Sequence, residues 1–170
     1  MKYILYLSLI LFFVSCKQEN KNLKKTIQKK PYYTSYSGKE SSWDLYFPDT
    51  IVLNRKYKGR IVYKGILDTI TTSFEDEHSR YIKVVLMTSD KLNGHLETLR
   101  KMAKDTFGAI NYREIPFYDI SFKKPGVNYI QGYIIDQVFL EAKGTKPKDS
   151  LVRMIEKQVT VNCKVFVKKE

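Results

Sequence analysis

The chain has few of the residues that most often carry catalysis or metal binding, with only two cysteines and two histidines among 170 residues. So few cysteines exclude a disulfide scaffold, and so few histidines exclude a His-rich metal protein. The motifs Gly-x-Ser-x-Gly, the Walker phosphate loop, His-Glu-x-x-His and Cys-x-x-Cys are also missing. These absences leave location and architecture as the properties on which the sequence is most informative.

The residues that are present suit a folded, strand-rich domain. The chain is 43% hydrophobic and 14% aromatic, with 13 tyrosines and 9 phenylalanines but only 8 glycines and 5 prolines. That is enough apolar material for one core, and rings in this number are typical of half-buried strands. The 30 Lys and Arg residues outnumber the 18 Asp and Glu residues, which gives a net charge of +12.

Residues 1–15 are typical of an export signal. Lys2 precedes an apolar run from Tyr3 to Val14 that only Ser8 interrupts, and the chain turns polar directly after Cys16. At about 1.5 Å per helical residue the run spans roughly 18 Å, well short of the roughly 30 Å hydrocarbon core of a bilayer. A cleaved signal peptide therefore fits better than a permanent membrane helix.

The end of this run, Phe13-Val14-Ser15-Cys16, resembles the lipobox of bacterial lipoproteins. In that family the cysteine receives diacylglycerol, the signal peptide is cut off before it, and the new amino terminus is acylated. The resemblance therefore places a lipid anchor of palmitate-type acyl chains on Cys16. A plain secretory signal and an uncleaved short anchor are the alternatives. Lys17, and not an aspartate, follows the cysteine, which by analogy with enteric-type bacteria favours the outer membrane over the inner one.

Residues 16–30 are predicted to form the lipidated cysteine and a basic, flexible tether. The tether has a single acid, Glu19, against six lysines: Lys17, Lys21, Lys24, Lys25, Lys29 and Lys30. Its two apolar residues, Leu23 and Ile27, are too few to support a fold. The lysines either attract anionic lipid headgroups, at about 1 kcal/mol per charge, or keep the linker solvated. Because an exported lipoprotein does not meet nucleic acid, we expect no nucleic-acid partner.

Residues 31–170 are predicted to form a single β-rich globular domain. Residues 31–48 have too many rings for a solvated tail, and Trp43 is expected in the core, not as a ligand-stacking platform. Short apolar runs separated by turns predict the strands, which are expected at residues 50–53, 60–63, 67–71, 80–88, 115–122, 127–141 and 159–168.

Two of these strands carry further detail. The stretch 127–141 is unusually long for a strand, so Gly132 is expected to mark a bulge, a bend or the close approach of another backbone. In the last strand Cys163 alternates with polar residues in step with four valines, Val159, Val161, Val165 and Val167. We therefore expect Cys163 to be a small buried hydrophobe and not a nucleophile.

One helix is predicted, because Leu96, Leu99, Met102 and Ala103 recur at helical spacing, with Asn93 as the candidate cap. Residues 149–157 fit a short helix or a strand equally well. Together the elements predict a mainly β fold, a β-sandwich of immunoglobulin-like type with one short helix in a connection. A β-barrel and an α+β fold are the alternatives.

The remaining candidate site residues have simple structural interpretations. Glu75 to His78 are potential metal ligands, but adjacent ligands rarely converge on one ion, so a solvated turn is favoured. His95 is assigned no role. Tyr129, Tyr133 and Asp136 either line a groove or belong to the core and to cross-strand pairs. No catalytic residue, metal or cofactor is predicted.

The sequence thus favours a membrane-anchored lipoprotein of the bacterial cell envelope that acts as a non-catalytic binding or structural module. Its expected partners are membrane lipid, through acylated Cys16, and an envelope protein or glycan. An exported hydrolase or metal-dependent enzyme, and a carrier of a hydrophobic ligand, are the competing hypotheses. A cluster of titratable residues in a pocket would favour the enzyme, and a wide apolar cavity would favour the carrier.

Overall fold

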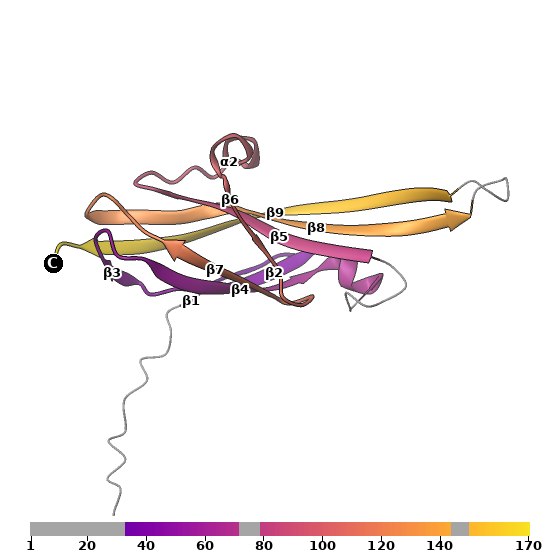
Figure 1. Cartoon of the computed structure of the whole chain (residues 1–170), viewed down its shortest axis with the longest axis horizontal. Coiled ribbons are helices and arrows are strands. Elements are labelled where there is room, and N and C mark those ends of the chain that lie inside the picture. The colour runs from indigo at the N-terminus through magenta and orange to yellow at the C-terminus, as the bar shows by residue number, and fades with distance from the viewer. Residues whose placement is uncertain (1–32, 72–78, 144–149) are drawn as a thin grey trace, which may run out of the picture.

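The strands form two sheets (Figure 1). The computed structural model describes residues 33–71, 79–143 and 150–170. The first sheet is antiparallel and runs in the order β1 (Tyr33–Ser37), β2 (Ser41–Tyr46), β4 (Tyr57–Gly65) and β7 (Glu114–Ile120). The second sheet runs in the order β3 (Thr50–Val52), β9 (Ser150–Lys168), β8 (Gly126–Lys143), β5 (Ser79–Ser89) and β6 (Asp105–Gly108). Among the strands of the described residues, only β3 and β9 pair in parallel.

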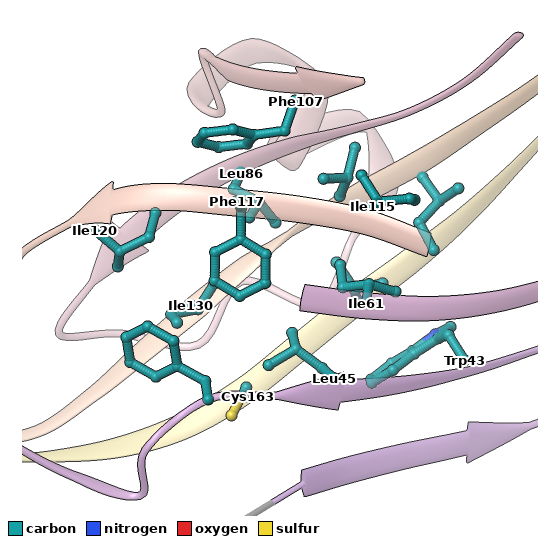
Figure 2. Packing of buried hydrophobic residues seen from close by; sticks show 14 of the residues in the cluster. Trp43, Leu45, Ile61, Leu86, Phe107, Ile115, Phe117, Ile120, Ile130 and Cys163 are labelled. Atoms are coloured by element: carbon teal, nitrogen blue, oxygen red, sulfur yellow. The ribbon is translucent and has the colours of Figure 1, made fainter. Parts of the chain in front are cut away.

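The inward faces of the two sheets fill the core between them. Figure 2 shows Leu45 and Ile61 of the first sheet meeting Ile130 and Cys163 of the second. All four side chains are fully buried, as expected for residues that alternate with polar neighbours along their strands. The predicted mainly β architecture of two packed sheets is confirmed. Its strand order is not that of an immunoglobulin domain, because β4 lies next to β2 and β9 lies between β3 and β8.

The one α-helix of the described residues lies on the outer face of the second sheet. Helix α2 (Leu96–Met102) packs Leu99 and Ala103 against Val85 of β5 and Tyr133 of β8. The predicted helix is confirmed, but its predicted cap is wrong, since His95 occupies the N-cap position without a side-chain hydrogen bond. The backbone N–H of Asn93 donates instead to Gln131 Oε1, at 2.7 Å.

Strands β8 and β9 form a hairpin much longer than the rest of the sheet. They pair without a register shift from Gly126 and Val167 to Lys143 and Ser150, and the hairpin projects beyond the end of β5 in Figure 1. We call this end of the hairpin, residues 137–143 of β8 and 150–158 of β9, the arm; β5 pairs with it as far as Phe139, which lies opposite Ser79. The sequence of residues 149–157 fits a short helix or a strand equally well, and the structure has a strand from Ser150 onward.

Several predictions of local structure are corrected. The strand expected at residues 67–71 is wrong, because a 3-10 helix, η2 (Ile66–Thr69), occupies most of that range. Gly132 makes no bulge, because β8 keeps its register with both β5 and β9 at this position. It allows a close backbone approach instead, because a Cβ there would lie 1.9 Å from the carbonyl oxygen of Val85. Strands β1, β2 and β6 were not predicted as strands.

Candidate functional site

A buried ionic cluster lies on the inner side of the second sheet, where β5 and β8 leave the core. Its centre is a two-point contact between Arg80 and Asp136, with Nε to Oδ1 at 2.9 Å and Nη2 to Oδ2 at 2.7 Å. Both side chains are fully buried. The register places Asp136 opposite Ile82, so the two charged residues are diagonal neighbours on one face of the sheet, within reach of each other.

Helix η2 and strand β4 complete this cluster. Asp68 Oδ1 lies 2.7 Å from Arg80 Nη1, a charge contact that is not aligned as a hydrogen bond, and the other oxygen of Asp68 pairs with Arg113. Arg80 Nη1 also donates to the carbonyl oxygen of Thr71, at 2.7 Å. The hydroxyl of Tyr63 donates to Asp136 Oδ2, at 3.3 Å. The cluster therefore ties β4, η2, β5 and β8 together.

The electrostatics of the cluster favour fixed charges. Burial raises the pKa of Tyr63 far above its usual range, and the charge of Asp136 and the hydrogen bond to it add to this. Burial alone would lower the pKa of Arg80. The hydrogen bonds to Asp136 and the negative charges of Asp136 and Asp68 outweigh this effect, so the pKa is raised. Two arginines facing two aspartates balance their charges. Such a network holds structure together.

The opposite, outer face of the arm carries exposed apolar side chains. Tyr81 and Val152 are each 58% exposed and Met154 is 52% exposed. Phe139 lies opposite Met154 in the β8–β9 register, and its ring meets that of Tyr81 edge-on with centroids 5.6 Å apart. We call these four residues the apolar arm patch. Helix α2 covers the neighbouring stretch of the same face, over Val85 and Tyr133, and leaves the arm end of this face uncovered.

A groove of about 900 Å³ runs beside the apolar arm patch. Tyr81, Phe139 and Val152 line it, together with Gly108 and Ala109 where β6 ends. Exposed apolar side chains gathered on one face are typical of interaction surfaces. The groove and patch are the part of the described chain best suited to bind a partner.

The residues singled out by sequence fall in different places. Trp43 is in the core, 3% exposed, and its Nε1 donates to the carbonyl oxygen of Thr160, at 3.0 Å. Cys163 is fully buried and free, as expected. Burial raises the pKa of its thiol, although a hydrogen bond from Thr34 acts in the opposite direction. His95 is exposed at the start of α2.

Tyr129, Tyr133 and Asp136 do not line a common groove. The two tyrosines lie on the outer face of β8, where Tyr133 packs under α2, whereas Asp136 faces the interior and binds Arg80. The interpretation as core and cross-strand residues therefore describes them better. Cys16, the six tether lysines and the segment from Glu75 to His78 lie outside the described residues.

The ionic cluster was missed by sequence reasoning, yet the sequence contained a signal for it. Arg80 begins the largely apolar stretch predicted as a strand at residues 80–88, and Asp136 lies within the long apolar stretch 127–141. Since a buried charge is stable only when it is paired, two opposite charges in two buried strands should meet. Within residues 33–71, 79–143 and 150–170 no group of three or more His, Cys, Asp or Glu side chains is placed to hold a metal ion.

Comparison with known proteins adds no relative. No protein-family model, no curated protein and no solved structure matches the chain significantly. Among the described residues, no helix is long and apolar enough to span a bilayer.

Proposed function

We propose that the chain is a lipid-anchored module of the bacterial cell envelope that binds a partner through its arm and carries out no catalysis. The observation that carries the anchor is Cys16, which resembles the lipidated cysteine of bacterial lipoproteins and stands where the apolar leader turns polar. Two or three acyl chains hold a protein firmly on a membrane, whereas one chain holds it only weakly. Lys17 after the cysteine supports delivery to the outer membrane.

The basic tether supports the same proposal. Residues 17–30 place six lysines beside the anchor, and lysines close to anionic headgroups add to membrane attachment. In this arrangement the folded domain from Tyr33 onward stands off the membrane with its arm free to meet an envelope protein or glycan.

The folded domain favours binding over the competing functions. The interior between the sheets is filled by large side chains such as Phe47, Phe117 and Phe122, which leaves little room for the wide cavity that a carrier of a hydrophobic ligand requires. The buried charged groups near the arm are engaged with one another. The apolar arm patch, by contrast, lies outside both buried hydrophobic clusters.

The anchor is tested by labelling cells with a tagged fatty acid. Cys16→Ser should abolish labelling and leave an uncleaved precursor. Cys163→Ser is the matched control, because Cys163 is the only other cysteine of the chain and is fully buried; this variant should be labelled like the wild type. Labelling that persists in Cys16→Ser would refute the proposed anchor.

A further inference from the structure

The arm has a long open strand edge. β9 pairs with β8 along its whole length, but on its other side it pairs only with β3, at Phe166 to Lys168. Among the described residues no other strand lies against that edge of β9 between Ser150 and Val165. Proteins usually shorten, cover or twist such edges, because unpaired backbone groups attract another strand.

The backbone groups that point to this edge can be identified by their alternation. The N–H of Phe166 donates to the carbonyl oxygen of Asp49, and the carbonyl oxygen of Lys168 accepts from the N–H of Leu53. The backbone N–H and C=O groups of even-numbered residues of β9 therefore point away from β8. The carbonyl oxygen of Thr160 agrees, since it accepts from Trp43. In an antiparallel ladder this alternation continues along the strand. The N–H and C=O groups of Val152, Met154, Glu156 and Gln158 therefore point outward along the edge.

The side chains that border the edge differ between its two faces. Val152 and Met154, both exposed, lie on the outer face with the apolar arm patch. Arg153 and Lys157 lie on the inner face; Arg153 is exposed, whereas Lys157 meets Glu40 at 3.1 Å. A strand added at this edge would meet Val152, Met154 and Glu156 on the outer face, and Arg153, Ile155 and Lys157 on the inner face.

These charges disfavour a second copy of the chain as the occupant. In a two-fold antiparallel pair of β9 edges, the residue at the centre lies opposite its own copy. A pair centred on Arg153 or on Lys157 therefore sets like charges against each other. A pair centred on Ile155 sets Arg153 of one copy against Lys157 of the other. Pairing centred on Glu156 opposes two glutamates. Like charges directly opposite one another destabilise strand pairing. Of the registers centred from Arg153 to Lys157, only the one centred on Met154 avoids this repulsion.

We propose that the edge of β9 from Val152 to Gln158 binds an extended polypeptide segment of another protein by adding it as a strand. The segment alternates apolar residues, which face Val152 and Met154, with acidic residues, which face Arg153. Backbone hydrogen bonds supply the affinity and the alternating side chains supply the specificity. This inference deepens the proposed function, because it names how the arm binds and what kind of partner fits it.

The test uses the full chain, purified in detergent, and a fluorescent peptide of alternating valine and glutamate long enough to span Val152 to Gln158. Binding is followed by fluorescence anisotropy, with a peptide of alternating valine and lysine as the comparison. We expect the glutamate peptide to bind and the lysine peptide to bind at least about tenfold more weakly, a difference of about 1.4 kcal/mol. Arg153→Glu should reverse this preference.

Met154→Pro tests the backbone contact. Proline lacks an N–H and its ring occupies the edge, but the N–H of Met154 points away from β8, so the substitution leaves the β8 ladder intact. It should weaken peptide binding at least about tenfold. Met154→Ala, which keeps the N–H, is the matched control and should bind within about threefold of the wild type. Circular dichroism and the thermal midpoint establish that both variants are folded.

The proposal is overturned if the wild type binds neither peptide, or if a folded Met154→Pro variant binds as tightly as Met154→Ala. Sedimentation of the wild type tests whether a second copy of the chain occupies the edge instead. A wild-type dimer that the Met154→Pro substitution dissociates would assign the edge to a second copy. None of these measurements depends on Cys16, so a failure here is separate from a failure of the lipid anchor.

Discussion

Arg80 and Asp136, separated by 56 residues in the chain, form a two-point ion pair in which both side chains are fully buried. The pair lies where the arm leaves the sandwich, and it joins β5 to β8 at the base of the arm. Through Asp68 and Thr71 the same arginine is fixed to η2 and the residues that follow it. This pair therefore joins the base of the arm to η2 and to the core.

Removing one charge of this pair should be costly. Asp136→Asn leaves the buried guanidinium of Arg80 only partly neutralised, and we expect the free energy of unfolding to fall by about 3 kcal/mol. Urea denaturation measures the change. Asp90→Asn is the control, since Asp90 pairs with Lys124 on the surface and its loss should leave stability close to that of the wild type. Equal losses in the free energy of unfolding would show that the buried pair stabilises the fold no more than the surface pair does.

Gly132 should tolerate no side chain. A Cβ at this position would lie 1.9 Å from the carbonyl oxygen of Val85, so Gly132→Ala has to push β8 away from β5. We expect a loss of about 3 kcal/mol or more in the free energy of unfolding. Gly94→Ala, where an added Cβ meets nothing within 4 Å, should change stability by less than about 0.5 kcal/mol. A stable Gly132→Ala variant would contradict the close approach of the two strands.

Cys163 should be inert in the folded protein. Its thiol is fully buried and burial raises its pKa, so a thiol reagent should react only after denaturation. Rapid reaction of native Cys163 would place the thiol in a functional site.

Substitution of the same cysteine tests its hydrogen bond. Cys163→Ser buries a hydroxyl, at a cost of about 1 to 3 kcal/mol when no partner is present. Thr34 Oγ1 lies 3.5 Å from Cys163 Sγ and offers a partner, so the cost should lie at the low end of that range. In a Thr34→Val background the same substitution should cost more. Equal costs in the two backgrounds would show that Thr34 does not satisfy the serine.

Periodicity predicted the parts of the fold that bury one face of a strand. The alternation of valines around Cys163 placed the inner face of β9 correctly, and the spacing of Leu96 and Leu99 placed α2, because in both cases the pattern reports burial directly. The hairpin of β1 and β2 was missed because Ser35, Ser37, Ser41 and Ser42 give it little apolar alternation, although Trp43 and Leu45 are buried.

The arm and the ionic cluster depend on pairing between distant segments, which a single pattern does not encode. Residues 149–157 could not be distinguished between helix and strand, because exposed Val152 and Met154 define no buried period; from Ser150 onward the conformation follows from register with β8. Likewise the strand expected at residues 67–71 is replaced by η2, in which Asp68 turns toward Arg80 and Arg113. Here a tertiary ion pair outweighs local strand propensity.

The central claim, that the arm binds a partner in the cell envelope, is tested most directly by photo-crosslinking in living cells. A photoreactive amino acid is introduced at Val152, in the apolar arm patch, or at Val127, which is also exposed on the outer face of the second sheet but lies at its other end. We expect irradiation to attach a discrete envelope partner at Val152 and none at Val127, and the Met154→Pro substitution to remove the adduct. No adduct at Val152, or the same adducts at both positions, would contradict the claim.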